Sequence, residues 1–161
     1  MLRLNRMTDY AIVVLGALAH RHGETMATAH LADLTGLGQP TVAKVAKILL
    51  ASSLLETQRG VHGGYRLTKP PADISLVDIV EAMEGPIAVT DCVAGAQDPC
   101  AISNCCFMSN NWNRVNLAIR NALNDISLKD LINPARIFPL PTISNDVTNN
   151  LNDRESNAVV Q

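Results

Sequence analysis

Two short predicted helices, followed by a glycine-rich hairpin, constrain the fold of this chain more than any other feature. The first helix is expected within residues 28–36, with Thr28 as its N-cap and with Leu31 and Leu34 buried. The second is expected over residues 39–52 and opens with a proline, whose missing N–H costs nothing at a helix start. Two helices with so short a connection have the dimensions of a helix-turn-helix.

The second of these helices has two unlike faces. Its apolar stripe consists of Val42, Val45 and Leu49. Its polar positions are Gln39 at the N-terminal end, then Thr41, Lys44 and Lys47. This division is typical of a recognition helix, which packs its apolar stripe inward and reads the DNA major groove with its polar face. An ordinary amphipathic helix with a solvated lysine face would show the same pattern.

The hairpin that follows has a basic, glycine-rich tip. Strands are expected over residues 54–58 and 65–68, and the tip between them contains Arg59 and His62 among three glycines. Directly after a helix-turn-helix, such a hairpin is predicted to be a wing, with Arg59 and His62 as further DNA contacts. A nucleotide-binding phosphate loop is disfavoured, because it needs a helix directly after the glycines and a strand stands there.

The distribution of charge favours the same interpretation. The whole chain carries a formal charge of −2. Residues 1–70 hold 8 Lys/Arg against 4 Asp/Glu, which gives +4, and the remainder holds 5 against 11, which gives −6. A basic N-terminal half attracts a polyanion such as DNA, although random scatter of so few charges is the alternative.

Three more helices are predicted outside this pair. The first covers residues 9–19, capped by Thr8; another begins with a capping box at Ser75 and runs to residue 83. A third runs from residue 111 and carries an apolar stripe suited to a partner helix, formed by Trp112, Val115, Ile119, Ala122 and Ile126. Residues 127–131 either continue this helix or begin a short capped one.

All four cysteines lie within a fifteen-residue stretch that lacks periodicity; they are Cys92, Cys100, Cys105 and Cys106. A disulfide framework, a metal or cluster site and a thiol redox switch are the three interpretations. The apolar run near the N-terminus is short and is approached by Asp9, so export is disfavoured and the protein is expected in the cytoplasm with reduced thiols. No segment approaches the length of a membrane span.

Thiolate is the usual ligand of an iron–sulfur cluster, and Cys92, Cys100 and Cys106 on a flexible loop can converge on one. Zinc is the alternative metal, but the spacing lacks the two close cysteine pairs of a ribbon or finger. A metal-free thiol switch remains a third possibility. No Cys-x-x-Cys pair, Ser–His–Asp grouping or paired carboxylates indicate catalysis, so no enzyme activity and no small-molecule substrate are expected.

The chain resembles the IscR/NsrR family of winged-helix transcription regulators, many of which carry an iron–sulfur cluster. The matching segments are residues 4–11, 40–49, 59–67, 74–80 and 84–86, and the helix that contains Trp112. The resemblance covers residues 1–133, and the wing is its most specific part. Residues 112–116 and 127–131 look most like the regulators of the SUF iron–sulfur assembly operon.

The resemblance implies a homodimeric repressor that binds a double-stranded operator and controls iron–sulfur assembly genes. A nitric-oxide or redox sensor of the same architecture is the alternative. Judged by distance to Trp112, Cys106 matches the third family cysteine and Cys105 is extra. Ser109 stands where some members have a histidine ligand. The implied fourth ligand is therefore Asp9 of the partner subunit, unless Asp9 only stabilises its own helix terminus. A 2Fe–2S cluster is preferred over 4Fe–4S.

The sequence thus predicts a mainly α fold with a small β wing: a winged helix-turn-helix joined to a long C-terminal dimerisation helix. Residues 1–70 form the predicted DNA-binding domain. Residues 71–133 hold the cluster loop and the dimerisation helix, and residues 134–161 form a tail that is rich in Asn, Pro and Ser and is predicted to be disordered.

Overall fold

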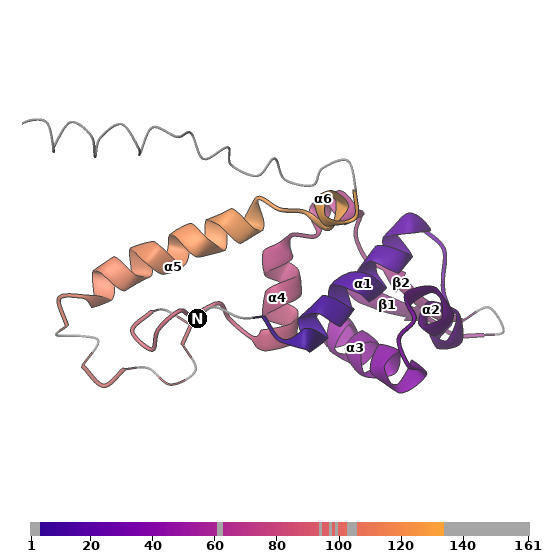
Figure 1. Cartoon of the computed structure of the whole chain (residues 1–161), viewed down its shortest axis with the longest axis horizontal. Helices are drawn as coiled ribbons and strands as arrows, with labels where there is room; N and C mark the ends of the chain where they lie inside the picture. Colours follow the sequence, from indigo (N-terminus) through magenta and orange to yellow (C-terminus); the bar gives the residue numbers. More distant parts are fainter. Residues whose placement is uncertain are drawn as a thin grey trace, which may run out of the picture.

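The computed structural model of this chain describes residues 4–60, 63–93, 95–96, 98, 100–102 and 106–133. Its elements are mostly helices, with one two-stranded antiparallel sheet, as predicted (Figure 1). In chain order they are α1 (Arg6–His20), α2 (Thr28–Thr35), α3 (Gln39–Ala51), β1 (Leu55–Gln58), β2 (Gly64–Leu67), the 3-10 turn η1 (Pro71–Asp73), α4 (Leu76–Glu84), α5 (Ser109–Asn124) and α6 (Leu128–Leu131).

Helix α1 begins earlier than predicted, because Asn5 and not Thr8 caps it. The Asn5 side chain accepts a hydrogen bond from the backbone N of Met7 at 3.1 Å. Thr8 is fully buried, and its hydroxyl donates to Glu84 Oε1 at 2.5 Å. The same carboxylate oxygen accepts from the backbone N of Asn5 at 2.7 Å. A carboxylate at the end of α4 thus binds the start of α1.

Helix α2 differs from its prediction in two respects. Thr28 is its first helical residue rather than its N-cap, and the N-cap Ala27 makes no side-chain cap bond. Leu31 is fully buried as predicted, but Leu34 is 52% exposed. Residues turn by about 100° along a helix, so Leu34 lies about 160° away from Ala32, which packs inward beside Leu31.

Helix α3 and the wing match the sequence closely. Val42, Val45 and Leu49 are fully buried in the main core. Strands β1 and β2 pair antiparallel, in the register that places Leu55 opposite Leu67.

The segment before α2 pairs with β2 through one isolated antiparallel bridge, between Met26 and Tyr65. The backbone N of Met26 donates to the carbonyl of Tyr65 at 2.9 Å, and Tyr65 N donates back at 2.8 Å. The wing is therefore attached to the helix-turn-helix by main-chain bonds as well as by packing.

Helices α4 and α6 start beside each other, each from a capping box. Ser75 and Asp78 form the first box, as predicted, and Ser127 and Asp130 form the second. Backbone bonds join the two starts, from Leu76 N to the carbonyl of residue 126 and from the N of residue 128 to that of residue 74, both at 2.8 Å. Residues 127–131 are thus a separate capped helix.

Helix α5 ends at this junction, where it packs against α4, and its other end extends away from α1–α3, above the cysteine loop (Figure 1). It begins and ends about two residues before the predicted bounds. Ile119 is half-buried against a small cluster on α4, whereas Val115 is 44% exposed and Ala122 is also exposed.

The main core includes residues from both predicted regions, residues 1–70 and residues 71–133. It contains residues of α1, α2, α3 and the wing together with Ile74, Ile79 and Leu128, all three fully buried. The domain boundary at residue 70 stays a prediction. The predicted tail, residues 134–161, lies outside the described residues.

Candidate nucleic-acid interface and cysteine site

Helix α3 presents its polar residues on the side away from the core. Gln39 is the first residue of the helix, after the glycine that serves as its N-cap, and it is exposed. Lys44 and Lys47 are exposed one turn apart, and Thr41 is half-buried beside them. Thr41, Lys44 and Lys47 recur every three residues and therefore share one strip of the surface of α3, whereas Gln39 stands at the N-terminal end of the helix.

The wing contributes one further predicted DNA contact among the described residues. Arg59 follows β1 directly and is exposed, whereas His62 lies outside the described residues. Arg66 on β2 donates to Glu56 on β1 at 2.6 Å, so its charge is already paired. Within the described residues, Lys44, Lys47 and Arg59 form no ion pair, which leaves their charges available for a polyanion.

Two glycines give the wing its path. A Cβ on Gly64 would lie 2.2 Å from the carbonyl oxygen of Met26, and a Cβ on Gly63 would lie 2.6 Å from that of Gln58. The backbones approach too closely at both positions for any side chain. The glycine-rich tip is thus required by packing of the hairpin, in addition to any role at a groove.

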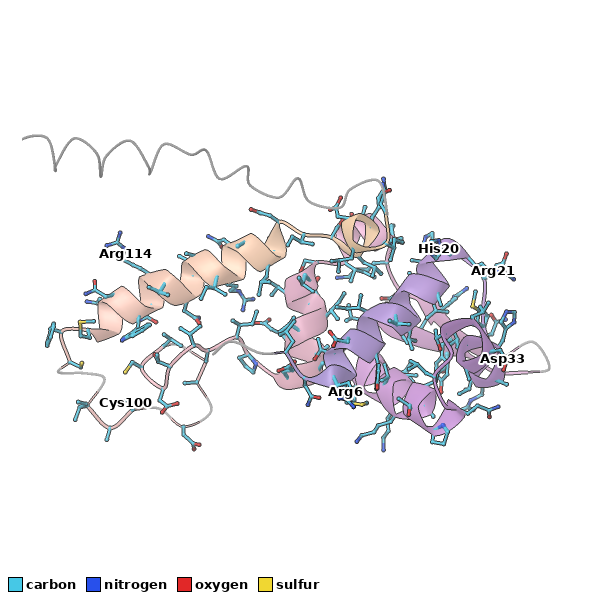
Figure 2. The ribbon with its side chains drawn as sticks, in the orientation of Figure 1. Arg6, His20, Arg21, Asp33, Cys100 and Arg114 are labelled. Atoms are coloured by element: carbon cyan, nitrogen blue, oxygen red, sulfur yellow. The ribbon has the colours of Figure 1, made fainter. Side chains whose placement is uncertain are left out.

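The described cysteines lie on the segment between α4 and α5, close to one another. Cys92, Cys100 and Cys106 are each partly buried thiols. The backbone N of Cys100 donates to the carbonyl of Asp91 at 2.9 Å, which folds the segment back on itself. The labelled Cys100 lies on this segment, remote from α1–α3 (Figure 2).

The thiols interact directly. Burial, a hydrogen bond with the Cys100 side chain and the nearby charges of the Cys100 and Cys106 thiolates raise the pKa of Cys92, whereas Thr90 lowers it. The Thr90 hydroxyl is buried beside the thiol without a fully formed hydrogen bond. The three thiols therefore lie near enough to one another for their charges to interact.

The donor set fits an iron–sulfur cluster in kind, because three soft thiols lie on one segment of the chain. No three or more His, Cys, Asp or Glu side chains lie at metal-binding separation within the described residues. Cys105 lies outside them. Asp9 is exposed on the first turn of α1 and makes no described contact with the cysteines. Its expected role is in the partner subunit's site, so it stays a prediction.

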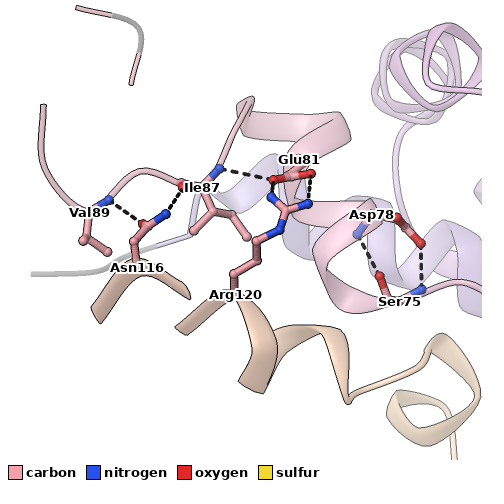
Figure 3. Close-up of polar contacts among 7 residues, drawn as sticks. All are labelled: Ser75, Asp78, Glu81, Ile87, Val89, Asn116 and Arg120. Atoms are coloured by element: carbon pink, nitrogen blue, oxygen red, sulfur yellow. Dashed lines mark hydrogen bonds and ion pairs between the residues drawn. The ribbon is translucent and has the colours of Figure 1, made fainter. Parts of the chain in front are cut away.

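A polar network that the sequence did not predict anchors the start of the cysteine segment (Figure 3). The buried Asn116 accepts from the backbone N of Val89 at 3.1 Å and donates to the carbonyl of Ile87 at 3.0 Å. Arg120, one turn further along α5, binds both carboxylate oxygens of Glu81 on α4. The one sequence signal is an asparagine on the buried face of α5, where apolar residues are expected.

Comparison with known proteins decides the family. The sequence model of the Rrf2 family, described as "Iron-dependent Transcriptional regulator", matches residues 4–134. The chain belongs to the Rrf2 family. It is 30% identical over 132 residues to the transcriptional regulator NsrR of Bacillus subtilis (strain 168), a match that covers 81% of this chain and 90% of NsrR. It is also 30% identical over 133 residues to the repressor NsrR of Streptomyces coelicolor, with 81% and 88% coverage.

Solved structures of Rrf2-type regulators have the same fold. CymR, the global cysteine regulator of B. subtilis, matches with a TM-score of 0.63 and 25% identity over 82% of this chain and 97% of CymR. T. potens IscR matches with a TM-score of 0.57 and 21% identity, over 99% of this chain and 93% of that one, and so supports the fold alone. This Rrf2 protein is a DNA-binding transcriptional regulator and not an enzyme. None of its described helices has the length and hydrophobicity to cross a membrane.

Proposed function

We propose that this Rrf2 regulator senses iron–sulfur status through a cluster held by Cys92, Cys100 and Cys106, and represses iron–sulfur assembly genes in the cytoplasm. The observation that carries the proposal is the gathering of these three thiols on one segment of a transcriptional regulator. Their soft sulfur donors are the ligands that iron–sulfur clusters take. Asp9 of a partner subunit would supply the fourth ligand of a 2Fe–2S cluster.

The DNA-binding part of the proposal rests on the surface of α3 and the wing. In this proposal Gln39 and Thr41 contact base edges, Lys44 and Lys47 contact phosphates, and Arg59 contacts a phosphate or the minor groove. His62 is proposed as a contact of the wing tip. A homodimer that pairs two copies of α5 would present two such surfaces to a pseudo-palindromic operator.

When bound, a cluster supplies a redox-active centre whose loss changes the charge and the order of its ligand segment. This chain's own residues hold that segment: Asn116 fixes its first backbone groups, and Glu84 connects the end of α4 to the start of α1. If the bond between Asp9 and the cluster were lost, the change would therefore act on α1, which packs directly against α3.

Anaerobic purification tests the cofactor. Visible absorption with iron and sulfide in equal amounts is expected, and Cys92→Ser, Cys100→Ser and Cys106→Ser should each abolish both. A colourless protein with one zinc and no sulfide would overturn the cluster. Operator affinity of the holo and apo forms, compared at one salt concentration, tests the sensor role, and equal affinities would remove it.

A metal-free thiol switch is the second candidate, and the hydrogen bond between the Cys92 and Cys100 side chains favours it. The similar structure of CymR belongs to a cysteine regulator. A peroxide would take two electrons and two protons from this pair, forming a disulfide and water. Mass spectrometry of the peroxide-treated apo protein distinguishes the two, because a Cys92–Cys100 disulfide that changes DNA affinity is expected only of a switch.

A further inference from the structure

Glu81 lies where three parts of the molecule meet. It lines an open groove of about 640 Å³ between α3 and α4, together with Lys44 and Lys47. Both of its carboxylate oxygens are bound by Arg120 of α5, with Arg120 Nη2 donating to Oε2 at 3.2 Å (Figure 3). Its Oε1 also lies 3.5 Å from the backbone N of Ile87, near the start of the cysteine segment.

Glu81 shares the groove with two lysines but forms its ion pair with an arginine of another helix. Glu81 forms its described ion pair with Arg120 and not with either lysine of the same groove. Its side chain is 26% exposed, so its charge is only partly screened by water. A bidentate guanidinium neutralises a carboxylate better than a flexible ammonium does. While Arg120 is in place, Lys44 and Lys47 keep their charge for another anion.

The geometry points to Arg120 as a positioning residue for DNA binding: by holding Glu81, it keeps a competing carboxylate away from Lys44 and Lys47. Without Arg120, Glu81 is an unpaired anion in the same groove as the two lysines. It then attracts their ammonium groups and repels a DNA phosphate. The inference rests on the proposed DNA contacts of Lys44 and Lys47, but α5 itself touches no DNA in it.

The position of Arg120 on α5 links the charge of Glu81 to the cysteine segment. Asn116, one turn before Arg120, binds the carbonyl of Ile87 and the backbone N of Val89. A displacement of that segment therefore acts on the part of α5 that carries Arg120. The Glu81–Arg120 pair is the described ion pair that joins α4 to α5, and its opening would change the charge at the recognition helix.

Four variants of the full chain separate this inference from simpler ones, each measured by fluorescence anisotropy with a labelled arbitrary-sequence duplex. Arg120→Ala should weaken binding about 3- to 10-fold at low salt and lower the slope of log K against log salt by about one. Glu81→Gln should bind at least as tightly as wild type. Adding Glu81→Gln to Arg120→Ala should restore affinity and slope to about the wild-type level, because the competing charge is gone.

Arg114→Ala is the matched control, because Arg114 is on the same helix, has no described ion pair and points away from the rest of the molecule (Figure 2). It should leave affinity within about twofold of wild type. If Arg114→Ala weakens binding as much as Arg120→Ala does, only the net charge matters and the inference is wrong. It is also wrong if Arg120→Ala has no effect, or if the double variant stays as weak as Arg120→Ala alone.

Lys44→Ala with Lys47→Ala distinguishes a failure here from a failure of the proposed DNA surface. If this pair of changes does not weaken binding, the proposed contacts fail and the inference fails with them. If it weakens binding while Arg120→Ala does not, the inference alone is overturned. Light scattering and thermal unfolding of each variant exclude loss of the dimer or of the fold as the cause.

Discussion

Gly64 lies where β2 passes closest to the segment before α2. Replacement by Ala would place a Cβ 2.2 Å from the Met26 carbonyl oxygen, so the backbone must move and the Met26–Tyr65 bonds must lengthen. We expect Gly64→Ala to lower the free energy of unfolding by about 1–3 kcal/mol, as measured by urea denaturation. Gly38→Ala is the control, since its Cβ would meet nothing closer than 3.8 Å and only the preference of the N-cap of α3 for Gly over Ala is lost. Equal losses in both variants would contradict the steric explanation.

The Cys92 thiol offers a test with opposite signs. Cys100→Ala removes a hydrogen bond and a charge that raise the pKa of Cys92, so this pKa should fall and more thiolate should form at a given pH. Alkylation of Cys92 in the apo protein, followed by mass spectrometry from about pH 7 to 10, should become faster.

Thr90→Val is the matched change, because the Thr90 hydroxyl lowers the pKa of Cys92. Its removal should shift the alkylation profile to higher pH. A shift in the same direction for Cys100→Ala and Thr90→Val would show that general loosening of the loop, and not these contacts, sets the reactivity.

The buried side chain of Asn116 forms polar contacts between helix α5 and the start of the cysteine segment. Asn116→Leu keeps the volume but leaves the carbonyl of Ile87 and the backbone N of Val89 without their described partners. Such a loss costs about 1–3 kcal/mol, and the amide of Val89 should exchange its hydrogen faster. The exposed Asn121 provides the control, and Asn121→Leu should leave that exchange unchanged. Unaltered exchange in Asn116→Leu would mean that α5 does not hold the segment.

The elements differ in how much of them could be predicted. The Ser75–Asp78 box and the start of α3 depend on contiguous residues, so the sequence contains their whole cause. The start of α1 does not: Asn5 and Thr8 are both good N-caps, and the choice follows from Glu84, which binds both. A contact between residues 76 or more positions apart has no local signature.

The candidate site divides in the same way. The strip on α3 follows from helical spacing, and the gathering of cysteines is visible in the chain itself. The Asn116 and Arg120 contacts depend on how α5 lies against α4, which no spacing within α5 determines. Periodicity alone predicts that Leu34 lies in the core, but it does not show that a two-turn helix buries only one narrow side, which leaves Leu34 exposed.

Across the whole molecule, the exposed apolar residues of α5 favour a second copy of the chain as their cover. Val115 is 44% exposed and Trp112 is 37% exposed. We expect Val115→Glu to convert the proposed dimer to a monomer in light scattering, since a charge at a dimer interface loses its hydration. Operator affinity should fall with it, because one subunit offers one recognition helix.

Asn121→Glu adds the same charge on the opposite side of α5 from Trp112 and should leave the dimer intact. A Val115→Glu protein that stays dimeric would place the subunit contact elsewhere. Loss of the dimer in both variants would indicate that helix stability, and not a contact surface, is responsible.

Because Leu128 is buried in the main core, that core is complete only late in the synthesis of the chain. The wing and recognition helix leave the ribosome first, yet their core includes a leucine made some sixty residues later, whose backbone N binds the carbonyl of Ile74. A nascent chain that stops before it has an unfilled hole among α1 and its neighbours, which costs about 2–5 kcal/mol. The half of the protein that would bind DNA therefore completes its core only after the half that would sense the signal has been synthesised.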